Sequence, residues 1–110
     1  MTRRIAILAV ALLLIGSAFG AEARDDDNSH KVTIKNLKYD PPKLTIKPGE
    51  TVQWINKDDN DHTVIADDES FASDNLGSGD KFTHTFDKKG TFKYHCKYHP
   101  RMKGQVLVQD

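Results

Sequence analysis

Three side chains that bind soft metal ions lie close together near the end of the chain. Cys96, His99 and Met102 offer a thiolate, an imidazole and a thioether, and two residues separate each from the next. Thiolate and imidazole donors suit copper, and a His₂Cys set with a long axial Met is typical of copper sites that transfer electrons. Zinc fits less well, because closed zinc sites take four Cys or His ligands and Met is a poor one. The segment therefore predicts a copper site that still lacks one imidazole.

His62 is the best candidate for the missing imidazole. It begins an alternating segment directly after the polar turn 57–61, and the alternation places it on the same face as Val64 and Ala66. Histidine at the start of a strand can meet a loop that lies at the same end of a sheet. We therefore expect His62 to face the loop 96–102.

The other histidines are expected to have different roles. His95 alternates to the side opposite Cys96, so we expect it at the surface or behind the ligands. His84 lies between two phenylalanines in mid-segment and is expected to be a buried, hydrogen-bonded core residue. His30 belongs to a charged stretch and is expected to be solvated.

The elements that position these residues alternate between apolar and polar residues with period two. The alternating segments are 31–35, 43–47, 51–54, 62–66, 81–86, 91–96 and 106–108. Turn signals separate them, and Pro41-Pro42 should mark a bend between two strands. Seven to eight short strands of this kind predict an all-β, Greek-key β-sandwich. Loops cluster at the ends of a sandwich, which would bring His62 to the loop of Cys96.

The N-terminus has the three parts of a secretory signal peptide. Arg3 and Arg4 precede an apolar run of eleven residues, 5–15, and small residues then lead to Ala21-Glu22-Ala23, an A-x-A cleavage pattern. A membrane span needs roughly 20 apolar residues, so this run is short for a permanent anchor. We expect residues 1–23 to be removed, residues 24–30 to form a flexible lead-in, and residues 31–110 to form one periplasmic domain.

Composition excludes several classes of function. The chain has 16 basic and 16 acidic residues, so it lacks the basic excess of a nucleic-acid binder. Cys96 is the only cysteine among 110 residues, so it forms no intrachain disulfide, and a bound metal would protect it in an oxidising compartment. One metal set without a second cluster argues against an enzyme. We expect a monomer that is not an enzyme and has no permanent membrane span.

These motifs resemble those of the cupredoxin family of small blue copper proteins. The matching features are the spacing Cys96-x-x-His99-x-x-Met102, the preceding Tyr94-His95, and the segment 47–56. The resemblance covers residues 31–109. It implies one type 1 copper ion, with His62, Cys96 and His99 as equatorial ligands and Met102 as the axial ligand. Relatives commonly carry Asn after the first histidine; here Thr63 stands there, and its hydroxyl can make part of the same hydrogen bonding.

The same resemblance implies an electron carrier that shuttles single electrons between Cu(I) and Cu(II). Redox partner proteins would dock transiently near His99. A copper-handling protein for delivery, storage or resistance is the alternative, and fast loss of the metal to a chelator would favour it. Relatives carry Pro and Phe where this chain has Tyr98 and Arg101, so a partner's identity does not carry over.

Charges around the expected metal end are mixed. Lys97, Arg101 and Lys103 form a basic collar, whereas Asp58, Asp59 and Asp61 lie in the segment before His62 and oppose it. We expect an acidic or mixed-charge partner whose association slows as salt rises.

Overall fold

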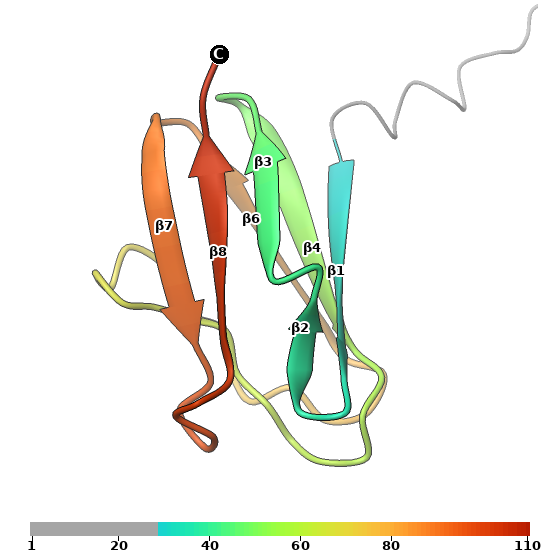
Figure 1. Cartoon of the computed structure of the whole chain (residues 1–110). Helices are drawn as coiled ribbons and strands as arrows, with labels where there is room; N and C mark the ends of the chain where they lie inside the picture. Colours follow the sequence, from blue (N-terminus) through green and yellow to red (C-terminus); the bar gives the residue numbers. More distant parts are fainter. Residues whose placement is uncertain (1–28) are drawn as a thin grey trace, which may run out of the picture.

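The structure, a computed structural model, describes residues 29–110, which form eight strands and no helix (Figure 1). The strands are β1 (Ser29–Lys35), β2 (Lys38–Asp40), β3 (Lys43–Ile46), β4 (Glu50–Asn56), β5 (Ile65–Ala66), β6 (Lys81–Phe86), β7 (Gly90–His95) and β8 (Lys103–Val108). The expected signal peptide, 1–23, lies outside the described residues, as do residues 24–28. No helix within 29–110 is long and apolar enough to cross a membrane.

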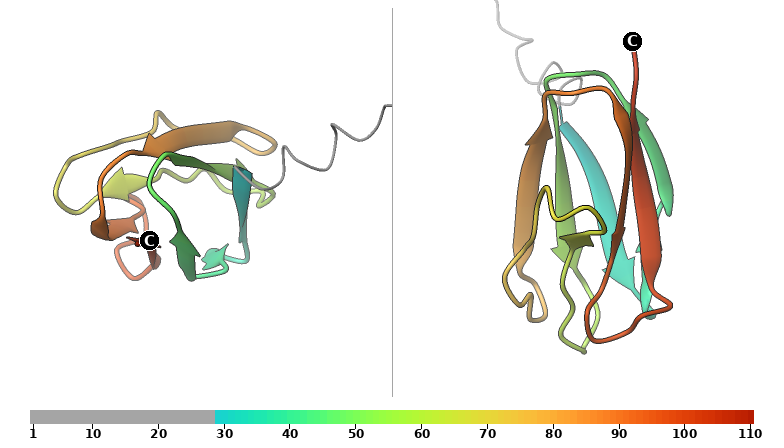
Figure 2. Two further views of the ribbon diagram at one scale, coloured as in Figure 1. Left: turned by 90° about the horizontal axis from the view of Figure 1, so that it is seen from above. Right: turned by 90° about the vertical axis from the view of Figure 1, so that its left-hand side faces the viewer.

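The strands form two four-stranded sheets that pack face to face. One sheet has the order β2-β1-β4-β6, and the other has the order β3-β8-β7-β5. The first pairs β1 with β4 in parallel, and the second pairs β3 with β8 in parallel; the remaining neighbours are antiparallel. The two layers are plain in the view from above (Figure 2). The expected all-β sandwich is therefore confirmed.

Alternation along the strands builds the core between the sheets. Val32 and Ile34 of β1, like Val52 and Trp54 of β4, are 0% exposed, while the residues between them face outward. Burying one such aliphatic side chain stabilises the fold by roughly 1.5–3 kcal/mol. Trp54 lies at the centre, with the rings of Phe71, Phe82, Phe86 and Tyr94 at centroid distances of 5.4 to 6.4 Å.

Two elements differ from the sequence expectation near the metal end. β2 follows β1 through a tight turn at Asn36 and Leu37, whose φ angles are 54° and 59°. No glycine marks this turn, which is why the alternation gave no signal for it. The segment 62–66 is a strand only at Ile65–Ala66, and His62 pairs through a single bridge with Leu76.

The N-terminal boundary also differs. The expected lead-in 24–30 is wrong at its end, because β1 already begins at Ser29 and pairs with β4. His30 is not solvated: its Nε2 lies 3.0 Å from a Glu50 carboxylate oxygen, and the side chain is half-buried. Residues 29 and 30 follow a charged stretch that gives no strand signal, but backbone pairing with β4 makes them part of β1. Pro41 and Pro42 mark a bend between β2 and β3, as expected.

Candidate metal centre

Three predicted ligands converge at one end of the sandwich. Cys96 and His99 lie in the loop between β7 and β8, and His62 lies between β4 and β5; both loops lie at the lower end of Figure 1. The Cys96 sulfur is 3.7 Å from His62 Nδ1 and 3.8 Å from His99 Nδ1. The three donor atoms all lie within 4.8 Å of one another. The clustering of loops at the end of the sandwich therefore brings the expected imidazole to the thiolate.

The seven-residue ligand loop is closed by its own backbone. The Cys96 N–H donates to the Met102 carbonyl at 3.2 Å, and the Met102 N–H donates to the His99 carbonyl at 2.9 Å. Met102 is only 4% exposed and belongs to the apolar core. Backbone bonds thus fix Met102 at the end of the loop, and its role as an axial ligand stays a prediction.

Burial differs among the three donors. His62 and Cys96 are both 0% exposed, whereas His99 is half-buried. His99 is therefore the most exposed of the three, and its imidazole gives the cluster its contact with solvent.

Asp58 holds the far side of the His62 ring. The His62 Nε2–H donates to Asp58 Oδ2 at 2.9 Å, and this fixes the tautomer in which Nδ1 presents its lone pair toward the thiol. The Leu37 N–H and the Asp59 N–H also donate to the Asp58 carboxylate. The bond from Leu37 and then that from His62 lower the pKa of Asp58, so the carboxylate stays charged behind the ring. Asp58, expected to oppose the basic collar together with Asp59 and Asp61, is only 9% exposed, and its partners are His62 and two backbone N–H groups.

Thr63 ties the two ligand loops together. Its Oγ1 accepts a hydrogen bond from the Lys97 N–H at 3.0 Å, so the hydroxyl connects the residue after His62 to the residue after Cys96. The hydrogen bonding expected of the Thr63 hydroxyl is therefore present. The Thr63 carbonyl in turn accepts a bond from the buried Tyr39 hydroxyl at 2.6 Å. Sequence reasoning missed Asp58 and Tyr39, since only the tertiary fold brings them to the loops.

The Cys96 thiol has a lowered pKa, which favours metal binding. Burial raises the pKa of Cys96, but polar contacts, first that with the His99 ring and then that with the Thr63 backbone, outweigh it and lower the pKa to about 6. A thiol with this pKa is largely ionised at neutral pH. Because the thiolate is the metal-binding form, the site needs little energy to release its proton when a metal enters.

The remaining histidines lie outside the cluster. His95 is half-buried on the outer side of the sheet, with Nδ1 2.7 Å from an Asp67 carboxylate oxygen, as its alternation predicted.

His84 is not a buried, hydrogen-bonded core residue. It is half-buried and packs against Phe71 and Phe86, each at a centroid distance of 4.7 Å, and its imidazole ring forms no hydrogen bond within residues 29–110. Burial lowers the pKa of His84. Its neutral ring acts as a flat packing surface.

The donor set fits copper. One ionisable thiolate and two Nδ1 imidazoles at mutual distances below 4.8 Å can surround a single ion. Soft sulfur together with imidazole favours copper, and no fourth Cys or His joins them among residues 29–110, as a closed zinc site would need. The backbone hydrogen bonds of both loops fix the donors, so a change of oxidation state would require little movement of the protein.

Comparison with known proteins agrees with this geometry. Residues 4–108 match the Cupredoxin-like domain family. The chain is 35% identical to amicyanin of Paracoccus versutus, in an alignment that covers 98% of this chain and 96% of that protein. A solved purple cupredoxin from Nitrosopumilus maritimus is 33% identical, with a TM-score of 0.71 over 73% of this chain and 99% of that one. The Cu(I) form of an amicyanin variant is also 33% identical, with a TM-score of 0.69 over 74% of this chain and 83% of that one. This chain belongs to the cupredoxin-like family.

Proposed function

We propose that this protein carries single electrons through one copper ion held by His62, Cys96 and His99, with Met102 as the axial ligand. The convergence of one thiolate and two imidazoles within 4.8 Å is the observation that carries the proposal. Bound copper would supply a one-electron couple between Cu(I) and Cu(II). Similarity to amicyanin over 98% of the chain supports the same function.

The protein's own residues keep this centre rigid. Asp58 orients His62, Thr63 connects the two ligand loops, and the backbone bonds of Met102 close the second loop. Electron transfer benefits when the ligands keep their positions in both oxidation states. The same rigidity disfavours the alternative, a copper-handling protein, because His62 and Cys96 are fully buried and a delivery site must release its metal quickly.

The exposed edge of His99 is the proposed place of electron exchange. Around it Leu37 and Tyr98 are 45% and 46% exposed, which is unusual for large apolar side chains within residues 29–110. Together with Pro100, Arg101 and Met102 they line a shallow hollow of about 430 Å³ at the metal end. An apolar rim of this size suits a transient contact with a redox partner protein. We place this contact in the periplasm, after removal of residues 1–23.

Adding Cu(II) to the purified protein tests the proposal. We expect an intense visible absorption band from charge transfer between the Cys96 thiolate and copper, reversible one-electron reduction, and slow loss of the metal to a chelator.

Cys96→Ser should abolish the band and His99→Ala should weaken copper retention. His95→Ala is the matched control, because that imidazole lies outside the cluster, and it should leave both unchanged. Met102→Gln should retain copper but lower the reduction potential, since a soft thioether favours Cu(I).

Two results would contradict the proposal. A band that persists in Cys96→Ser would show that the thiolate is not the ligand. Rapid exchange of the metal with a chelator in the unaltered protein would favour copper handling over electron transfer.

A further inference from the structure

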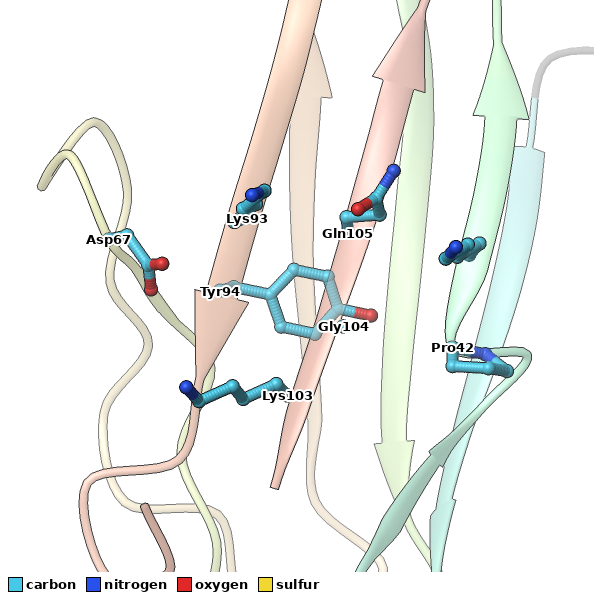
Figure 3. Close-up of a pocket in the computed structure, with 8 residues that line it drawn as sticks. Pro42, Asp67, Lys93, Tyr94, Lys103, Gly104 and Gln105 are labelled. Atoms are coloured by element: carbon cyan, nitrogen blue, oxygen red, sulfur yellow. The ribbon is translucent and has the colours of Figure 1, made fainter. Parts of the chain in front are cut away.

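Two adjoining grooves beside the metal end carry six cationic side chains among the residues that line them. One groove, of about 400 Å³, lies between the β1–β2 hairpin and the start of β8. The other, of about 350 Å³, lies over β7, β8 and the start of β3 (Figure 3). Pro42 and Lys103 line both, so the grooves form one continuous surface. We call this surface the basic face; its cations are Lys35, Lys38, Lys43, Lys93, Arg101 and Lys103.

The positive charge of the basic face is largely uncompensated. Only two carboxylates, Asp40 and Asp67, line the same grooves. Asp67 already accepts a hydrogen bond from His95 at 2.7 Å. Within residues 29–110 none of the six cations forms an ion pair with a carboxylate. Six cations against two carboxylates leave the surface free to attract an anionic group.

The basic face is continuous with the hollow around His99. Leu37, Arg101 and Met102 line both that hollow and the groove beside the β1–β2 hairpin. A partner segment bound along the basic face would therefore bring the adjoining partner surface against the His99 edge. The β1–β2 hairpin contributes Lys35, Leu37 and Lys38 to this arrangement, which the sequence gave no reason to place near the ligand loop.

The segment 57–80 carries mainly the opposite charge: eight acidic residues and a single basic one, Lys57. Of the eight, Asp67 lines the basic face and Asp58 is buried behind His62. An acidic partner would be repelled by the other six, which are exposed, and attracted by the basic face. The two signs together would orient the partner before contact.

We infer that the basic face docks an acidic surface segment of the redox partner protein and directs that partner to His99. This inference rests on the proposed function and names the chemistry of its partner. Attraction between exposed charges falls as the Debye length shortens from about 30 Å at 0.01 M salt to about 8 Å at 0.15 M. Docking should therefore be strong at low salt and weak at physiological salt.

A titration with a hexaglutamate peptide tests the inference. The copper-loaded, reduced protein is followed by amide chemical shifts at low salt, which report binding residue by residue. We expect shifts on the basic face, and the double variant Lys38→Glu/Lys43→Glu should bind about tenfold more weakly. The matched control is Lys47→Glu/Lys88→Glu, which changes the net charge equally but lies in the turns after β3 and β6, at the other end of the strands. It should bind nearly as well as the unaltered protein.

Several results would overturn the inference. Equal weakening by both double variants would mean that only net charge matters, and shifts outside the basic face would mean another site. Binding to phosphatidylglycerol vesicles without binding to the peptide would point to a lipid surface instead of a protein. The visible band and reversible reduction of the same samples test the proposed function separately, so either idea can fail alone.

Discussion

At the scale of single residues, the geometry of the metal centre depends on side chains that are not themselves proposed metal ligands. Asp58 selects the tautomer of His62, and Thr63 bonds to the backbone of Lys97. Such partners orient a ligand and raise its basicity, and their loss typically weakens metal binding 10- to 100-fold. The Asp58 carboxylate also accepts a hydrogen bond from the Leu37 N–H, so it connects the β1–β2 turn to the metal site.

Asp58→Asn should therefore weaken copper retention by roughly 10-fold or more. The amide can still accept a bond from His62, but it lacks the negative charge that stabilises the ring when the ring binds a cation. The rate of copper loss to a chelator measures the effect. Asp59→Asn is the control, since Asp59 is exposed and contacts the site only through its backbone; equal rates in the two variants would contradict the role of Asp58.

The lowered pKa of Cys96 predicts a pH dependence of the metal-free protein. The folded thiol has a pKa of about 6 against 9.0 ordinarily, so the folded state loses its proton first as pH rises. The resulting stabilisation is fully present above pH 9 and is lost as pH falls to about 6. Thiolate ultraviolet absorption should titrate with a midpoint near this lower value. Urea unfolding should show the free energy of unfolding rising between the two pH values, and Cys96→Ser should lack that rise.

At the scale of elements, two neighbouring strands fit only because one residue has no side chain. Gly104 of β8 lies opposite Tyr94 of β7, and a Cβ atom at Gly104 would overlap the Tyr94 ring. Figure 3 shows this ring lying beside Gly104. Tyr94 is 1% exposed and contacts Trp54 and Tyr39 edge-on, so it has no room to move away. The glycine thus fixes β8, and with it the end of the ligand loop, against β7.

Gly104→Ala should destabilise the metal-free protein by about 1–3 kcal/mol, because overpacking forces a buried ring from its position. Urea unfolding followed by tryptophan fluorescence measures the change. Gly77→Ala is the matched control, since the new methyl would meet its nearest neighbour, an Asp80 carboxylate oxygen, at 3.4 Å. Similar stability losses in both variants would show that the Tyr94 contact is not the cause.

At the scale of the whole molecule, the metal end is built from four separate stretches of chain. The β1–β2 turn, the segment after β4, the segment before β6 and the β7–β8 loop meet there, and hydrogen bonds donated by Leu37, Asn56, Leu76 and Lys97 join them. Asn56 connects two of these stretches by donating to the Asn60 and Leu76 carbonyls at 2.9 and 2.8 Å. A ligand that joins two of the loops should therefore stabilise the entire fold.

Removal of the metal should lower the free energy of unfolding. A ligand that binds only the folded state stabilises it by about 2.7 kcal/mol at a free concentration 100 times its dissociation constant. Thermal unfolding of copper-loaded and chelator-treated protein measures the difference. Cys96→Ser should show a much smaller difference between the two conditions; an equal gain with and without the thiol would mean that copper binds elsewhere.

The sequence alone predicts much of this arrangement, because its signals are local. Alternation over segments such as 31–35 and 51–54 specifies strands with one buried face, and the spacing of Cys96 and His99 places two donors in one short loop. The same alternation indicates the strand-like start at His62, although pairing there is limited to a single bridge with Leu76.

Only the tertiary structure decides how the loops meet and which polar groups are buried between them. In the sequence Asp58 belongs to a run of acidic residues, for which a surface position is expected. In the structure hydrogen bonds from His62 and Leu37 hold its carboxylate in a buried position. In the sequence His30 belongs to a charged N-terminal stretch. In the structure the pairing of β1 with β4 places it beside Glu50. The bonds of Leu37 to Asp58 and of His30 to Glu50 join residues about 20 positions apart, so no local pattern encodes them. Asp58 and His62 are only four positions apart, but no helix or strand period pairs them. These bonds exist because the fold brings the partners within hydrogen-bond distance.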